Sequence, residues 1–192
     1  RERMRLRSDQ KRWGTVTKAL HWLSAAALIA VLAHGWWMTN MIPRDGRLWH
    51  YATHGLIGFY LALLMAIRIV WRLTERAPDF PGARPGWETA LAHAGHLALY
   101  ALSVALVVSG YIMWSAFPAR FVPARAAMFD YSLFGFLKVP ALHAKANLEV
   151  FRFWEDVHEE LSHIFELLIV VHVAAALRHH YVKRNDVLRR ML

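Results

Sequence analysis

The sequence has 192 residues, of which 57% are hydrophobic and 19% charged, and its formal net charge is +9. This apolar fraction, gathered in long runs, argues against a soluble globular protein. The absence of cysteine excludes disulfides, thiolate zinc sites, cysteine-ligated iron–sulfur clusters and covalent c-type haem attachment. The positive charge does not indicate nucleic acid, because the basic residues lie beside the apolar runs, where they orient a membrane protein.

Two apolar runs occupy the first half of the chain. The first, at about 19–38, follows a basic segment, residues 1–16. Its length of ~20 residues suits a membrane span better than a signal peptide. A short turn leads to the second run, at about 49–71, and proline, glycine and charged residues then mark a loop at 72–86. The pattern predicts two membrane-spanning helices joined by a tight turn.

Two further apolar runs lie in the second half, at about 88–114 and 155–181. Residues 115–155 connect them and are rich in proline and aromatic residues, with no clear secondary structure in their pattern. Connections of this length are often functional. The sequence shows no internal repeat or second domain, so we expect residues 1–192 to form one domain. The predicted fold is an all-α integral membrane bundle of four helices in up-down-up-down order.

Lysine and arginine residues are distributed unequally between the two ends of these helices. Sixteen of the 23 lie in the N-terminal segment, the 68–84 region and the C-terminal tail, and seven lie in the two opposite connections. Cytoplasmic segments of membrane proteins carry an excess of these residues. We therefore expect both termini in the cytoplasm.

The fourth run carries two histidines, His158 and His172, which are fourteen residues apart. At about 100° per residue they face the same side of a helix, and roughly 21 Å separates them along its axis. Ionisable side chains inside membrane spans are costly and are candidates for function. Each histidine could hold one side of a haem, if another helix supplies a second histidine at the same depth.

Depth limits the partners of these two histidines. His21 and His34 are thirteen residues apart, about 220° around their helix, so they cannot both point into one bundle core. His50 lies next to Trp49 at the membrane interface, whereas His54 lies deeper. The choice at the depth of His172 stays open. The residues at the depth of His172 are His21, His93 and His96, and those at the depth of His158 are His34, His50 and His54.

Glycine and arginine residues accompany His54 on its run. Gly55 and Gly58 follow it, and glycines allow a planar macrocycle or a neighbouring helix to approach closely. Arg68 lies on the same face at the depth of His172, where it could pair with a haem propionate. Structural alternatives exist, because membrane histidines bridge helices, Arg68 can reach headgroups and glycines can serve packing alone. The histidines expected to be structural or interfacial are His34, His50, His143 and His163.

Other chemistries have weaker patterns. The sequence contains no HExxH zinc motif, G-x-S-x-G, P-loop or GxGxxG in a strand–helix context. His158, Glu159, Glu160 and Glu166 suggest a carboxylate-bridged di-metal site, but the other spans lack the inward-facing Glu-x-x-His pattern. A transporter is expected to show inverted repeats and broken helices, which are not visible.

The ordered set of residues resembles the bacterial cytochrome b561 family, the prokaryotic di-haem four-helix membrane cytochromes. The resemblance covers nearly all of the chain after residue 12. It is carried by residues 18–22 (KALHW), by His54, Gly58 and Arg68, by residues 91–100 (LAHAGHLALY), by His158 and Glu159, and by residues 172–181 (HVAAALRHHY) with the basic end.

The resemblance implies two b-type haems, the cytoplasmic one held by His21 and His172 and the opposite one by His54 and His158. The family is similar to quinone-reacting cytochromes, and one branch oxidises superoxide at the outer face and reduces ubiquinone. The expected function is therefore electron transfer between an outer, periplasmic donor such as superoxide and the ubiquinone pool of the bacterial inner membrane. The alternative is a haem-bearing anchor that relays electrons for a partner dehydrogenase, bound through residues 115–155.

The resemblance also directs attention to residues outside the four ligands. His179, His93 and His96 are expected near a quinone or the haem propionates, with helix capping as the structural alternative. Basic residues of the long connection are expected to steer an anion such as superoxide, with headgroup contact as the alternative. These are Arg120, Arg125, Lys138, Lys145 and Arg152. The expected partners are membrane lipid, quinone and a periplasmic donor or partner protein, and not nucleic acid.

Overall fold

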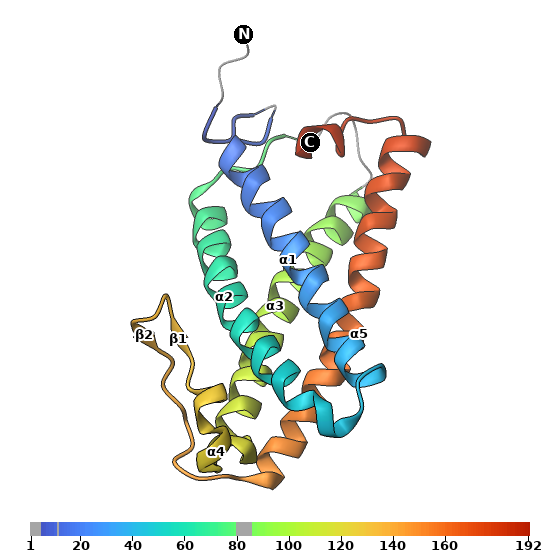
Figure 1. Ribbon diagram of the computed structural model, residues 1–192. Helices are drawn as coiled ribbons and strands as arrows, with labels where there is room; N and C mark the ends of the chain where they lie inside the picture. The colour runs from blue at the N-terminus through green and yellow to red at the C-terminus, as the bar shows by residue number, and fades with distance from the viewer. Residues whose placement is uncertain (1–4, 11, 80–85) are drawn as a thin grey trace.

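The computed structural model describes residues 5–10, 12–79 and 86–192. Parts of the basic segment and of the 72–86 loop therefore lie outside the described residues. Four long helices form the body of the molecule, and each is long and apolar enough to cross a membrane (Figure 1). The prediction of a four-helix membrane bundle is confirmed. The helices are α1 (Thr15–Asn40), α2 (Arg47–Thr74), α3 (Gly86–Ala116) and α5 (Leu148–Leu177).

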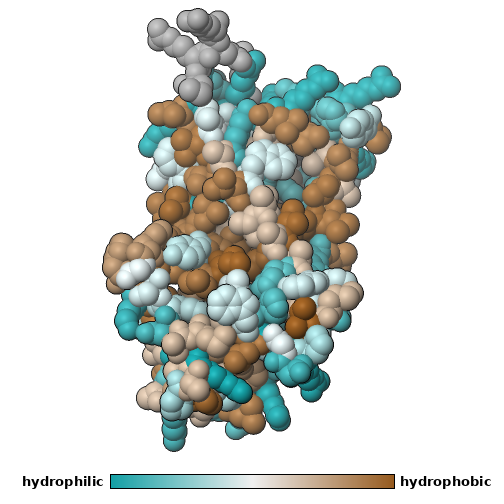
Figure 2. Space-filling view, viewed as in Figure 1, coloured by the Kyte–Doolittle hydropathy of each residue, from teal (hydrophilic) through white to brown (hydrophobic). Residues whose placement is uncertain are grey.

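The helices pack in chain order. Close backbone contacts join α1 to α2, α2 to α3 and α3 to α5, whereas α1 and α5 make few among the described residues. The described N-terminal residues and the C-terminal tail lie at one end of the bundle, here called the terminal end (Figure 1). The α3–α5 connection lies at the other, the loop end. Apolar residues dominate the middle of the bundle, and hydrophilic residues gather toward both ends (Figure 2).

Local signals explain where the helices change direction. Pro43 and a short 3-10 helix, η1 (Arg44–Gly46), turn the chain from α1 into α2. Asn147 caps α5, because its side chain accepts a hydrogen bond from the Val150 N–H at 3.1 Å. This cap starts α5 seven residues before the apolar run expected at 155. At its other end, α5 passes into a π-helix, η4 (Arg178–Val182).

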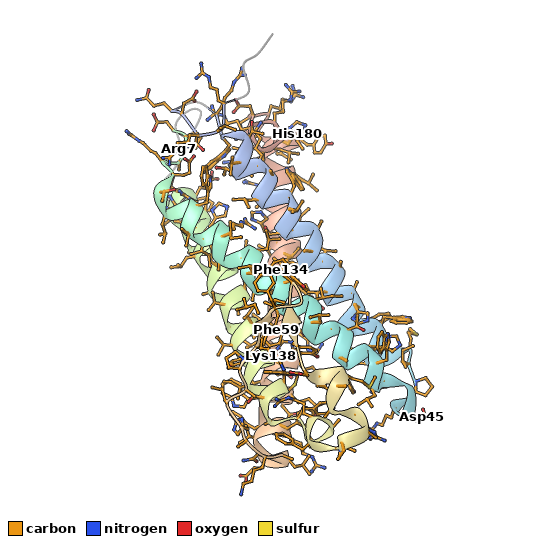
Figure 3. All side chains as sticks on the ribbon, turned by 60° about the vertical axis from the view of Figure 1, so that its left-hand side comes forward. Arg7, Asp45, Phe59, Phe134, Lys138 and His180 are labelled. Atoms are coloured by element: carbon orange, nitrogen blue, oxygen red, sulfur yellow. The ribbon has the colours of Figure 1, made fainter. Side chains whose placement is uncertain are left out.

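The connection at the loop end has secondary structure that the sequence pattern did not indicate. Its β-hairpin turns at Phe134 and Gly135, whose φ angles are 54° and 78°. The hairpin lies alongside α2 (Figure 1), and the Phe134 N–H donates to the Tyr60 hydroxyl at 3.0 Å. Phe134 therefore lies beside the middle of the bundle, away from Asp45 at the loop end (Figure 3). The elements are η2 (Pro118–Phe121), α4 (Pro123–Ala126), η3 (Ala127–Phe129), β1 (Ser132–Leu133) and β2 (Leu137–Lys138).

An aromatic core joins this connection to α2 and α3. Trp114 and Tyr131 stack with ring centroids 5.2 Å apart, and Phe59 meets both rings edge-on. The Tyr131 hydroxyl donates to the Ala52 carbonyl at 2.8 Å. The connection is thus packed onto the helix that carries His54.

Glu75 connects the N-terminal segment to the end of α2. It follows α2, and its side chain is 3% exposed and accepts a hydrogen bond from the Ser8 N–H at 2.7 Å. Burial alone would raise the pKa of this carboxyl, but the hydrogen bonds from Ser8 and the charges of Arg7 and Arg72 outweigh it and lower the pKa. Glu75 therefore holds the N-terminal segment onto α2.

The C-terminal tail covers the same end. The Trp22 Nε1–H donates to the Met191 carbonyl at 2.6 Å, and Arg190 donates to the Asp79 carbonyl at 2.7 Å. Glu88, in the first turn of α3, pairs with Lys183 and Arg178. Through these contacts the tail packs against α1, the segment at Asp79 and the start of α3.

Candidate functional site

Two pairs of histidines face each other across the bundle. His54 of α2 and His158 of α5 have ring centroids 6.3 Å apart, with an angle of 88° between the ring planes. Nearer the terminal end, His21 of α1 and His172 of α5 have ring centroids 6.4 Å apart, with an interplanar angle of 70°. Each pair joins two different helices, as the depth argument required.

This spacing fits one iron between each pair of rings. A metal–imidazole bond is about 2 Å long, so two imidazoles bound to opposite sides of one metal have ring centres roughly 6 Å apart. A buried nitrogen of His54, Nδ1, also has no hydrogen-bond partner among the described residues. Buried nitrogens without partners are uncommon in folded proteins and call for an explanation. The residues present therefore fit a haem held between two histidines.

Two glycines lie against the rings of the His54–His158 pair, and the sequence reasoning missed both. A Cβ on Gly35 of α1 would lie 3.3 Å from Cε1 of His54, and one on Gly110 of α3 would lie 3.2 Å from Cε1 of His158. The glycines singled out from the sequence behave differently. A Cβ on Gly58 would meet nothing within 4 Å, and one on Gly55 would meet the Tyr131 hydroxyl at 2.5 Å.

Ser109 of α3 lies within hydrogen-bond distance of His158. Its hydroxyl oxygen is 2.8 Å from Nδ1 of His158 and 3.1 Å from the Leu106 carbonyl oxygen, to which the hydroxyl can donate. When the hydroxyl gives its one hydrogen to that carbonyl, it accepts from the ring, and Nδ1 then carries the proton. Nε2 is then left with a free lone pair, which is the form that binds a metal. The sequence reasoning also missed Ser109.

A third histidine lies at the level of the second pair. The ring centroid of His96 is 5.5 Å from that of His172, closer than two rings on opposite sides of one iron. His93 is exposed and has no ring contact with His172 among the described residues. The structure thus places His96 beside the His21–His172 pair, and His93 outside it.

Arg68 points into the bundle rather than toward headgroups. It donates to the Ser24 hydroxyl and, from Nη2, to Nδ1 of His21 at 2.9 Å. Its guanidinium also lies 5.3 Å from the centre of the Tyr100 ring. Arg68 therefore reaches the candidate ligand His21 directly.

His34, expected to be structural or interfacial, is half-buried and lies beside His54. Its ring stacks on that of His54 with centroids 5.8 Å apart and lies 5.7 Å from that of His50. The side of α1 that faces α2 differs from the side that faces α5, so His34 meets His54 while His21 meets His172. The two histidines therefore lie on different sides of α1, as their spacing of thirteen residues predicted.

The basic residues expected to steer an anion have different surroundings in the structure. The Arg120 guanidinium lies 4.2 Å from the centre of the Trp114 ring, and Nη1 donates to the Ser115 carbonyl at 2.7 Å. Lys138 pairs with Asp130 at 3.0 Å. Arg125 is exposed at the loop end. Arg120 and Lys138 therefore have structural partners already.

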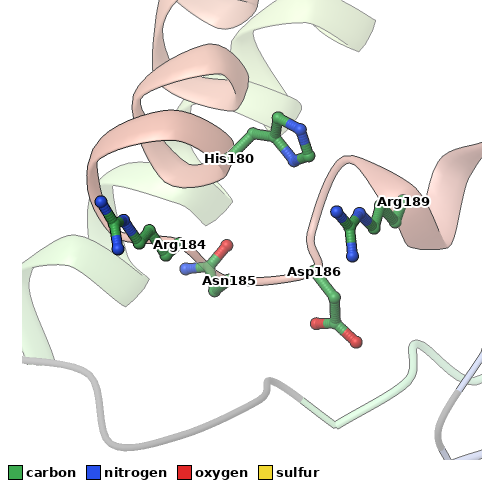
Figure 4. Close-up of a pocket in the computed structure, with 5 residues that line it drawn as sticks. All are labelled: His180, Arg184, Asn185, Asp186 and Arg189. Carbon is green, nitrogen blue, oxygen red and sulfur yellow. The ribbon is translucent and has the colours of Figure 1, made fainter.

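His179 lies beside a polar pocket at the terminal end. Its Nδ1 accepts a hydrogen bond from the Asn185 amide at 2.9 Å. The pocket, of about 270 Å³, opens between η4 and the tail (Figure 4). Within the described ranges, no group of three or more histidine or acidic side chains is placed to hold a bare metal ion. The pocket is lined by His180, Arg184, Asn185, Asp186 and Arg189.

Comparisons with known proteins agree with the fold. The chain is 34% identical to cytochrome b561 homolog 2 of Escherichia coli (strain K12), over 98% of this chain and 95% of that protein. It is 26% identical to cytochrome b561 homolog 1 of the same organism, over 90% and 92% of the two chains. It is also 25% identical to the probable superoxide oxidase CybB of Yersinia pestis, over 95% and 96%.

The family description that matches is that of prokaryotic cytochrome b561, and the match covers residues 12–192. Four spanning helices in a protein of this kind imply the bacterial inner membrane. The chain belongs to the prokaryotic cytochrome b561 family, whose members are membrane electron-transfer proteins with b-type haem.

Proposed function

We propose that the chain holds two b-type haems, one between His54 and His158 and one between His21 and His172. The observation that carries this proposal is the pair of matched spacings, 6.3 Å and 6.4 Å, between histidines of different helices. A haem held between two imidazoles would relay single electrons and would not bind oxygen.

The chain's own residues then have distinct roles. Gly35 and Gly110 leave room beside the ligand rings, and Ser109 holds His158 in the tautomer that binds iron. Arg68 lies at the His21–His172 pair and would pair with a haem propionate there, because a carboxylate is a stronger acceptor for a guanidinium than a neutral imidazole.

The proposed direction of transfer is from the loop end to the terminal end. The excess of lysine and arginine at the terminal end supports a cytoplasmic location for both termini. The loop end would then face the periplasm, where the donor reacts. The relative named as a probable superoxide oxidase supports superoxide as that donor. Exposed Arg125 would attract the anion to this end. Arg120 adds a second positive charge there, whereas Asp130 offsets the charge of Lys138.

Ubiquinone is the proposed acceptor, at the terminal end. Two superoxide anions each lose one electron and become oxygen, and the two electrons with two protons convert ubiquinone to ubiquinol. His96 lies beside His172. His93 lies on the same helix, α3, and His179 lies on η4. An imidazole can accept a proton at one ring nitrogen and release one from the other, so these residues are suited to proton transfer to a quinone.

The test uses the chain purified in detergent. A pyridine-haemochrome assay with iron counted per chain should give two haems. Superoxide generated in solution should then reduce the haems, and an added ubiquinone analogue should reoxidise them and appear as ubiquinol. A protein without b-type absorption bands contradicts the haem proposal, and one that transfers electrons only when a dehydrogenase is added supports the anchor function instead.

A further inference from the structure

A row of ionisable side chains runs along α5, outside the candidate haem sites. Glu159, His163 and Glu166 are spaced by four and three residues, so they share one face of the helix. Glu159 and His163 are exposed, and Glu166 is half-buried. The inward face of α5 carries Phe165, which is 1% exposed. This face lies about a third of a turn around the helix from the row. The row therefore points outward from the bundle.

Glu166 lies deep in the membrane-spanning segment. It follows His158 by eight residues, about 12 Å along the helix, and precedes His172 by six residues, about 9 Å. The helix around it, Leu148–Val182, is one of the four apolar spans. Glu166 is thus near the bilayer centre, and His163 is between it and the loop end.

None of these three side chains has a hydrogen bond or ion pair with another residue in the described parts of the chain. Two charged side chains in other spans do have partners, because Arg68 donates to Ser24 and Glu88 pairs with Lys183. Acyl chains offer no hydrogen-bonding groups, and an unpaired ionisable group at this depth is costly. The row therefore needs a polar partner from outside the chain.

We propose that this partner is a second copy of the chain, packed side by side through α5 in the membrane. The row is self-complementary, because one histidine lies between two carboxylates. When two parallel α5 helices meet across a two-fold axis along the membrane normal, His163 of each copy lies against Glu159 and Glu166 of the other. A second copy inserted in the same direction brings these groups to the matching depth.

The same face continues toward the terminal end as an apolar surface. Val170 and Val173 follow Glu166 at intervals of four and three residues and are 64% and 48% exposed. Side chains of this kind pack closely between helices in lipid. The inference does not depend on the haem assignment, because the depth of the row follows from the apolar span alone.

Cysteine cross-linking tests the interface, and the chain has no cysteine of its own. Val170→Cys places a thiol on the proposed interface. Val171→Cys is the matched control, because Val171 is the next residue, is 55% exposed and points about 100° away. In native membranes treated with a short bis-maleimide, Val170→Cys should give a cross-linked dimer and Val171→Cys should give little. Equal cross-linking of the two variants, or none in either, overturns the proposal.

A charge exchange tests the pairing itself. In the Val170→Cys background, H163E leaves only carboxylates in the row and should reduce the dimer roughly tenfold for each polar pair lost. The double variant H163E/E166H restores a histidine opposite a carboxylate and should recover cross-linking. Both variants should keep the haem content of the parent, which shows that they fold. Failure of the double variant to recover the dimer, or a single-chain mass for the unmodified protein in mild detergent, contradicts the proposal.

Discussion

Gly110 of α3 lies so close to His158 of α5 that a Cβ in its place would be 3.2 Å from Cε1 of the ring. Gly35 has the same relation to His54, at 3.3 Å. Larger side chains at these two positions would displace the rings of His54 and His158, so that the rings no longer face each other. We therefore expect Gly110→Val and Gly35→Val each to lose the haem of the His54–His158 pair. Haem counts per chain and the loss of one b-type redox component measure this result.

Gly86→Ala serves as the control for the glycine variants, because Gly86 is the first residue of α3. A Cβ there would meet nothing within 4 Å, so this variant should keep two haems. Loss of haem from the control, or full haem content in Gly110→Val, would show that close approach of the glycine is not what admits the cofactor.

Single substitutions distinguish the four proposed ligand histidines from their neighbours. We expect His54→Ala and His172→Ala each to lose one haem, because each removes one of two axial bonds. His96→Ala should keep both haems, since His96 lies beside the His21–His172 pair rather than across from it. The pyridine-haemochrome assay reads each result. One haem in His96→Ala, with two retained in His21→Ala, would move the ligand assignment from His21 to His96.

The four spans and the His158–His172 spacing could be predicted, because apolar length and helical phase depend on local sequence. The choice of His21 over His93 and His96 could not, because depth alone leaves three candidates. The structure favours His21 through a ring distance between α1 and α5. The family resemblance pointed to the same residue before that distance was known.

Features that depend on how the helices cross could not be predicted from the sequence. Gly35 and Gly110 become important only when α1 and α3 place them against rings on other helices. The two-residue strands of the hairpin are too short for a sequence pattern, and contacts with Tyr60 and Trp114 hold them in place. The contact of His34 with His54 likewise depends on how α1 packs against α2.

Ser109→Ala should raise the midpoint potential of the haem at His158. The Ser109 hydroxyl accepts the Nδ1 proton of the ring, which makes the imidazole a more electron-rich ligand. Its loss weakens stabilisation of the oxidised iron, and we expect a shift of roughly 30–60 mV, where about 59 mV is tenfold for one electron. Redox titration of the purified protein measures the shift. Ser103→Ala is the control, since Ser103 is also buried on α3 but donates only to the Leu99 carbonyl.

The terminal end should loosen in acid through Glu75. Its pKa in the folded protein is below the ordinary value of 4.5, so its contribution to stability is present above that value and is lost as pH falls through the lowered pKa. Glu75→Gln removes this contribution at neutral pH and should flatten the acid part of the stability curve. Thermal unfolding in detergent between neutral and acidic pH measures it. The exposed Glu160→Gln should leave the curve unchanged; a parallel change there would point to net charge instead of Glu75.

Gly55 and Tyr131 should behave as a coupled pair. A Cβ on Gly55 would lie 2.5 Å from the Tyr131 hydroxyl, which itself donates to the Ala52 carbonyl at 2.8 Å. Gly55→Ala therefore forces the ring away and should cost about 1–3 kcal/mol. Tyr131→Phe loses one buried hydrogen bond and should cost about 1 kcal/mol.

The double variant decides whether these two effects share one contact. With the hydroxyl gone, the nearest remaining ring atoms would lie 3.1 Å from the new Cβ, so a shift of a few tenths of an ångström relieves the clash. The unfolding temperature of Gly55→Ala/Tyr131→Phe should thus be higher than the sum of the single effects predicts, at about 2–4 °C per kcal/mol recovered. Strict additivity would mean that Gly55 is needed for another neighbour, and that the loop-end connection is not held to the His54 helix through this contact.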